Sequence, residues 1–156
     1  MPPIELESSR TYPVDVEVAF DRVLPTPLPD LFTRRYAAIP PIKAIRDQHG
    51  EWGTVGQTRT IQLADGGTLR ETLTAVDRPR SFDYRLSDVT GPMKPLVSGI
   101  AGTWRFDPAG TGTRITWAWT LDPRGSLGRA AMPAFTRMWQ GYARQVLEEI
   151  ERLLVP

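Results

Sequence analysis

Residues 126–154 read SLGRAAMPAFTRMWQGYARQVLEEIERLL, and the rest of the chain is organised around this stretch. Its large apolar side chains recur at three- and four-residue steps, which is the spacing of one face of an α-helix. Arg144 and Glu148 fall on the opposite side as an i,i+4 pair. Ser126 is the expected N-cap, and Pro133 predicts either a kink or a later helix start. The apolar stripe consists of Phe135, Met138, Trp139, Tyr142, Val146, Ile150 and Leu153.

The segments before this helix predict strands of a sheet. The apolar stripe of the helix is expected to pack against that sheet. Apolar residues alternate with polar ones in each segment, which is the pattern of half-buried strands. Glycine-containing turns such as ADGG and PAGTG separate several of them. We therefore expect an α+β protein with a curved antiparallel sheet of six to seven strands around one long C-terminal helix. The predicted strands lie within residues 57–63, 69–75, 82–86, 96–107 and 115–121.

The N-terminal third is less regular because prolines interrupt it. Residues 1–10 are expected to be a loose lead-in, and residues 12–20 alternate like a first strand. Residues 27–35 predict a short helix that turns Leu28, Leu31 and Phe32 inward. Residues 42–47 are expected to be a second short helix or an irregular segment. The predicted order is thus a strand, two short helices, a run of hairpins and the long helix.

Hairpin geometry gives expected strand registers, since directly opposed residues point to the same face of a sheet. A three-residue loop at Asp65 would place Arg59 diagonal to Glu71 on the inner face. The last hairpin would set Gly102 opposite Trp117, leaving room for the indole ring. A loop at residues 77–80 would oppose Ala75 to Phe82 and Glu71 to Leu86.

Composition excludes several classes of function. The 156 residues suffice for one domain with a real core, and the net charge of +1 gives no reason to expect nucleic acid or an anionic membrane as a partner. The chain has no cysteine, so disulfides and thiolate chemistry are excluded. The N-terminal residues lack the apolar run of a signal peptide, and no stretch is long and apolar enough for membrane insertion. A cytoplasmic location is expected.

The chain resembles the START-like (SRPBCC) superfamily, which includes polyketide cyclase/dehydrase and Bet v 1-type lipid-binding proteins. The resemblance covers nearly the whole length and is carried by the element order, by VGQTRTIQLADGGTLRETLTAVDRPRSFDYRL and GTWRFDPAGTGTRITWAW, and by the final helix. It implies a helix-grip fold for residues 1–156 as a single START-like domain. It also implies a cavity between sheet and helix that takes an apolar small molecule, although function varies among such folds.

Arg59 and Glu71 are the polar residues that lie on otherwise apolar strand faces. A buried charge must be paired or must shift its pKa. Either the two residues form a polar anchor for a ligand or they are a structural ion pair, and Glu71 is a weaker candidate for a catalytic acid. The lone His49 lies in a loop without a second imidazole or thiol, so we expect no metal site and no cofactor. The candidate ligand-binding residues are Arg59, Glu71, Tyr84, Trp104, Trp117, Trp119, Phe135, Met138, Trp139 and Tyr142.

Three functional hypotheses remain open from the sequence. The first is binding or transport of a hydrophobic small molecule of the lipid, polyketide or isoprenoid type, by a monomer or homodimer. The second is a polyketide aromatase/cyclase-like enzyme, which would need a titratable group at the reacting carbon. The third is an interaction protein whose cavity is collapsed and filled by tryptophans. The volume of the cavity distinguishes the third hypothesis from the other two.

Overall fold

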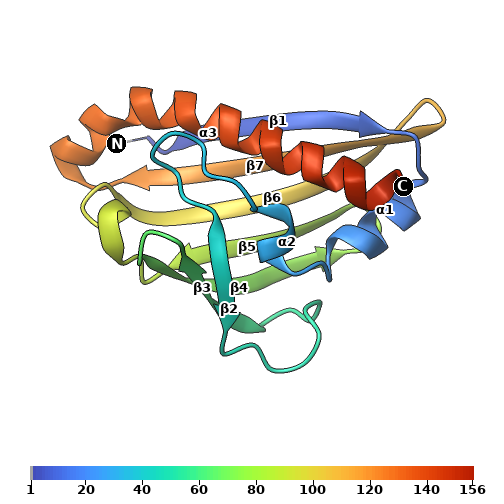
Figure 1. Cartoon of the computed structure of the whole chain (residues 1–156), viewed down its shortest axis with the longest axis horizontal. Helices are drawn as coiled ribbons and strands as arrows, with labels where there is room; N and C mark the ends of the chain where they lie inside the picture. The colour runs from blue at the N-terminus through green and yellow to red at the C-terminus, as the bar shows by residue number, and fades with distance from the viewer. Residues whose placement is uncertain (1) are drawn as a thin grey trace.

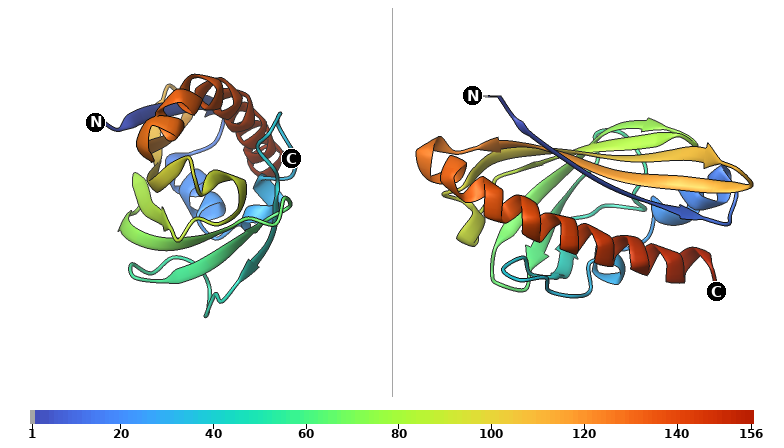
Figure 2. Two further views of the ribbon diagram at one scale, coloured as in Figure 1. Left: turned by 90° about the vertical axis from the view of Figure 1, so that its left-hand side faces the viewer. Right: turned by 90° about the horizontal axis from the view of Figure 1, so that it is seen from above.

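The computed structural model describes residues 2–156, which fold into one curved antiparallel sheet with a long helix across its concave side (Figure 1). Viewed from the end, the sheet curls like a trough and the helix closes its open side (Figure 2). The strand order is β1-β7-β6-β5-β4-β3-β2. The predicted helix-grip architecture is therefore confirmed. The elements are β1 (Ile4–Tyr12), α1 (Val16–Val23), α2 (Leu28–Leu31), β2 (Ile42–Arg46), β3 (Thr58–Leu63), β4 (Thr68–Asp77), β5 (Ser81–Ser87), a 3-10 turn (Gly91–Met93), β6 (Val97–Ala109), β7 (Gly112–Pro123) and α3 (Gly125–Leu154).

Helix α3 is continuous over its full length, and the predicted start is wrong by two positions. Arg124 is the N-cap residue, with an extended backbone and no side-chain capping bond, so Ser126 lies inside the helix. Pro133 also lies inside the helix, at an exposed position. Met138 and Leu153 are only half-buried, while Leu147 is buried in the core. Among residues 2–156, no helix combines the length and the apolar character that crossing a membrane requires.

Strand β1 and helix α1 differ from the sequence-based expectation. Residues 4–12 form an edge strand paired along its whole length with β7, rather than a loose lead-in. Residues 16–23 are helical rather than part of a strand, and Ala19, Phe20 and Val23 are the buried residues of the helix. Val23 lies three residues after Phe20 and four after Ala19, which is the spacing of one helix face. Val18 lies off this face and is 43% exposed. The alternating valines follow the strand period, whereas the residues that pack against the core follow the helical one.

Residues 42–46 also differ from expectation, because they form strand β2 rather than a helix. The strand lies at the edge of the sheet and pairs with β3 from Ile42 opposite Leu63 to Arg46 opposite Thr60. A bulge interrupts the pairing between Ile42 and Ala44. Pro40 and Pro41 precede the strand, and α2 ends well before them, so the chain enters the sheet directly from the loop.

Two hairpin registers are shifted by two residues from those predicted. The β3–β4 loop spans residues 64–67, so Arg59 lies directly opposite Glu71 rather than opposite Leu73. The β6–β7 turn has only two residues between Ala109 and Gly112. That turn places Gly102 opposite Trp119 and Trp104 opposite Trp117. A shift of two residues keeps every side chain on its predicted face, because the side-chain period of a strand is two.

The β4–β5 hairpin agrees with the predicted register over only part of its length. Glu71 lies opposite Leu86, as expected. A bulge between Leu73 and Ala75 then shifts the pairing, so that Val76 rather than Ala75 lies opposite Phe82. The bulge adds one residue to β4 and turns Val76 toward the core side of the sheet.

Gly102 makes room for Tyr84, not for the indole of Trp117 as the predicted register implied. Gly102 pairs with Tyr84 across β5 and β6, and a Cβ atom on Gly102 would overlap the Tyr84 ring. The hydroxyl end of the Tyr84 ring thus lies directly over Gly102 on the inner face. Gly102 is the position that permits a tyrosine in the middle of the concave surface.

We predict that Gly102→Ala lowers the free energy of unfolding by about 1–3 kcal/mol, because the new methyl group must displace the buried Tyr84 ring. Gly99→Ala is the matched control on the same strand, since a Cβ there meets only ordinary contacts with Arg85 and Asp122. Urea unfolding of both variants measures the difference. Equal stability of the two variants would contradict this role for Gly102.

Candidate functional site

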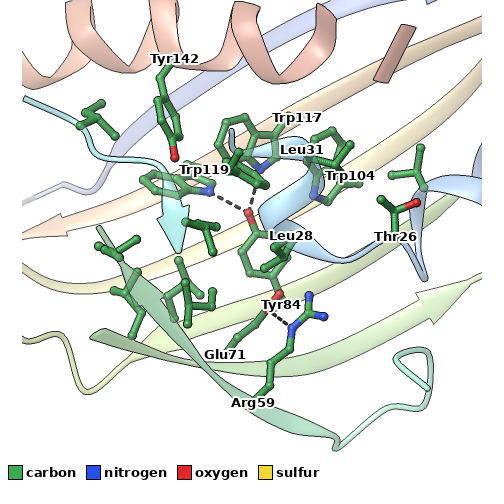
Figure 3. Close-up of a pocket in the computed structure, with 18 of the residues that line it drawn as sticks. Thr26, Leu28, Leu31, Arg59, Glu71, Tyr84, Trp104, Trp117, Trp119 and Tyr142 are labelled. Carbon is green, nitrogen blue, oxygen red and sulfur yellow. Dashed lines mark hydrogen bonds and ion pairs between the residues drawn. The ribbon is translucent and has the colours of Figure 1, made fainter. Parts of the chain in front are cut away.

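An apolar pocket of about 80 Å³ lies on the concave side of the sheet (Figure 3). Strands β3 to β7 form its floor and walls. Its cover consists of the end of α1, helix α2 and the loop that leads into β2. Helix α3 contributes only Tyr142 to the lining. The pocket therefore lies mainly between the sheet and the α1–β2 segment, beside α3 rather than beneath it.

Stacked aromatic rings explain why α3 contributes so little to the pocket. Trp139 on the helix is fully buried, and its ring centroid lies 4.8 Å from that of Trp117 and 5.8 Å from that of Trp119. Phe135 stacks on Trp119 with centroids 6.5 Å apart. These contacts fill the space directly between helix and sheet. Trp104 also stacks on Trp117, with centroids 5.4 Å apart, and forms part of the pocket wall.

Tyr84 rises from β5 in the interior of the pocket, with its hydroxyl directed at two tryptophans (Figure 3). Trp117 Nε1 donates a hydrogen bond to the Tyr84 oxygen at 2.7 Å, and Trp119 Nε1 donates another at 2.8 Å. Burial raises the pKa of the Tyr84 hydroxyl above its ordinary value, against the smaller lowering effect of the two indole donors. The hydroxyl is therefore neutral and carries its proton at physiological pH.

Arg59 and Glu71 form a buried ion pair at the other end of Tyr84 (Figure 3). Arg59 Nε donates to Glu71 Oε1 at 2.6 Å, and the two residues are only 3% and 4% exposed. The guanidinium also lies 3.8 Å from the ring centroid of Trp52, a cation–π contact, and its Nη1 approaches Gln48 at 3.4 Å. Burial raises the pKa of the Glu71 carboxyl, and the charge and hydrogen bond of Arg59 oppose that shift.

The cover of the pocket is attached to α3 through side chains of the helix. Tyr142 donates its hydroxyl proton to the carbonyl oxygen of Pro40 at 2.9 Å. A Cβ atom on Gly141 would overlap the ring of Tyr36, so the absence of a side chain at this helix position lets the loop approach closely. Arg34 also contacts Glu148 of α3 at 3.2 Å, in an exposed ion pair. Aromatic packing and a buried hydrogen bond thus hold the loop over the pocket.

The structure brings together seven of the ten candidate ligand-binding residues. Phe135, Met138 and Trp139 lie outside the lining, the first and last because they pack against the tryptophans of β7. His49 is exposed in the loop between β2 and β3. The residues that line the pocket are Arg59, Glu71, Tyr84, Trp104, Trp117, Trp119 and Tyr142.

Sequence reasoning did not include the cover residues in the site. Their signal was present in the inward orientation predicted for Leu28, Leu31 and Phe32, but nothing in the pattern showed what these side chains would face. The loop carbonyl of Pro40 could not be identified from side-chain patterns either. The further lining residues include Val23, Leu24, Thr26, Leu28, Leu31, Phe32, Ile39, Pro40 and Ile42.

Comparison with known proteins gives one family match over almost the entire chain. The sequence profile of the family described as "Polyketide cyclase / dehydrase and lipid transport" matches residues 3–155. No curated protein sequence matches the chain significantly.

Solved structures share the fold at low sequence identity. Ginseng major latex-like protein 151 from Panax ginseng superposes with a TM-score of 0.74 at 17% identity, over 100% of both chains. A protein from Nitrosospira multiformis gives a TM-score of 0.71 at 15% identity, over 97% of both chains. The structure of Ara h 8.0201 gives 0.67 at 18% identity, over 95% of this chain and 97% of the other. At these identities the likeness concerns the fold alone.

We predict that Arg59 and Glu71 are energetically coupled. Arg59→Leu and Glu71→Leu should each cost about 3–5 kcal/mol of unfolding free energy, because each leaves one buried charge without its partner. The double variant should be more stable than either single variant, since it removes both charges and leaves two apolar side chains in an apolar wall. Urea unfolding of the wild type, both single variants and the double variant at pH 7 measures the coupling energy. Additive effects of the two changes would show that no such coupling exists.

Proposed function

Because the chain belongs to the polyketide cyclase/dehydrase and lipid transport family, we propose that it binds a compact, mostly apolar small molecule in the pocket between the sheet and the α1–β2 segment. The observation that carries this proposal is the pocket itself, an apolar interior with a few fixed polar groups. Sites for small molecules typically have this composition. The family's description includes transport of lipids, which agrees with such a role.

The size of the pocket supports a compact ligand. Its volume of about 80 Å³ is well below the roughly 300–1,000 Å³ of typical ligand clefts. A ring-sized molecule is the appropriate class for the space as it stands. An extended acyl or polyketide chain would require the cover to move away from α3, at the cost of the Tyr142–Pro40 hydrogen bond and the Tyr36–Gly141 packing.

The polar groups support binding over catalysis. A general acid or base must be within hydrogen-bond reach of the substrate and free to exchange a proton. Glu71 instead accepts a short hydrogen bond from Arg59, and the guanidinium is in turn held against Trp52. The pair thus gives the apolar pocket a fixed polar end. Its dipoles orient a ligand, and it takes no part in proton transfer.

We expect α-methylstyrene, a neutral single-ring hydrocarbon, to bind with a dissociation constant of about 100 µM or tighter, roughly −5.5 kcal/mol. Leu28→Trp should weaken binding by about tenfold, ~1.4 kcal/mol, because Leu28 lines the pocket and a larger side chain would occupy the space. Ligand-observed NMR titration measures both affinities.

Leu127→Trp is the matched control, because it introduces the same change on a helix at a position 61% exposed and outside the pocket. It should leave the affinity unchanged. Absence of binding of both α-methylstyrene and its isosteric ketone acetophenone to the wild-type protein at millimolar concentration would refute the proposal. An equal effect of the two substitutions would show that the ligand binds elsewhere.

A further inference from the structure

The Tyr84 hydroxyl has its acceptor capacity filled by protein. A phenolic hydroxyl has one proton to donate and an oxygen that accepts. Both indole N–H groups of Trp117 and Trp119 point at this one oxygen, at 2.7 and 2.8 Å. Two donors at such distances occupy the lone pairs of the oxygen, so a further donor finds no place there. The hydroxyl can interact with anything else only by donating its own proton.

That proton has no acceptor among residues 2–156. Each hydrogen bond of the Tyr84 hydroxyl is one that it receives. Tyr84 is 7% exposed and lines the pocket, so a molecule that occupies the pocket is placed to supply the missing acceptor. A buried donor without a partner is unfavourable, and most such groups in folded proteins are paired.

The other nearly fully buried tyrosines show that Tyr84 is an exception in this chain. Tyr12 donates its hydroxyl proton to the carbonyl oxygen of Leu147 at 2.6 Å. Tyr142 donates to the carbonyl oxygen of Pro40 at 2.9 Å. In both cases a backbone carbonyl lies where the proton points. At Tyr84 no such carbonyl among residues 2–156 accepts the proton, and the residue lines the pocket.

We propose that the ligand of this pocket is a carbonyl compound whose oxygen accepts the hydroxyl proton of Tyr84, an inference that rests on the function proposed above. The two indole donors polarise the hydroxyl and make it a stronger donor, because hydrogen bonds in a chain reinforce one another. The stacked Trp104 and Trp117 rings offer an apolar surface for the remainder of the molecule. A ligand that can only donate, such as an ammonium group, finds no acceptor at Tyr84.

The test compares two isosteric probes, acetophenone and α-methylstyrene, which differ only in C=O against C=CH₂. Isotope-edited infrared spectroscopy with carbonyl-¹³C acetophenone reports the carbonyl stretch in the bound state. We expect a stretch shifted below its value in alkane solvent, as a hydrogen-bonded carbonyl shows. Tyr84→Phe should return the stretch toward the alkane value. It should also lower the preference for the ketone over the alkene about 3–10-fold.

Tyr12→Phe is the control for loss of a buried tyrosine hydroxyl, since Tyr12 lies outside the pocket lining. It should leave the carbonyl stretch of bound acetophenone unchanged. If α-methylstyrene binds but the ketone shows an alkane-like stretch, or a stretch that Tyr84→Phe does not alter, the inference is wrong and the proposed function stands. If neither probe binds, both are wrong.

Discussion

The contact between Trp139 of α3 and Trp117 of β7 is the constraint on which the arrangement of this protein depends. The two rings lie 4.8 Å apart and are almost completely buried, so they fix how closely the helix approaches the sheet. Because the aromatic rings fill that interface, α3 acts as a core element with only Tyr142 at the pocket. The empty space is shifted toward β3, β4 and β5, where a short helix and a loop cover it. A fold usually described as a sheet gripping a helix thus places its pocket beside the helix.

The charged residues and the tyrosine of this interior are each held in place by specific neighbours. Arg59 and Glu71 pair directly across β3 and β4, and the Trp52 ring packs against the guanidinium. Tyr84 depends on Gly102 for space and on two indole N–H groups for its position. The inner face is therefore an ordered set of dipoles within an apolar chamber. Pre-positioned dipoles of this kind favour one orientation of a bound molecule over another.

The sequence predicted the faces of the strands better than their pairing. Arg59, Glu71 and Tyr84 are on the inner face as expected, because strand alternation survives a register error of two residues. The error itself came from turn length, which a glycine-rich turn leaves ambiguous. Val16 and Val18 fitted a strand period that tertiary packing overrode. The cover of the pocket was missed because Ile39 and Pro40 belong to a loop, whose path depends on contacts such as Tyr36 on Gly141 rather than on local pattern.

The clustered tryptophans also determine the optical behaviour of the protein. Trp104, Trp117, Trp119 and Trp139 form a connected cluster with neighbouring centroids 4.8–5.8 Å apart, whereas Trp52 has no aromatic partner among residues 2–156 and lies against Arg59. At such separations the electronic transitions of indole rings couple and excitation energy passes rapidly between them. The near-ultraviolet circular dichroism and the emission of these four rings are therefore coupled, and Trp52 contributes separately. A molecule that contacts any one of these rings therefore changes the spectroscopic signal of all four.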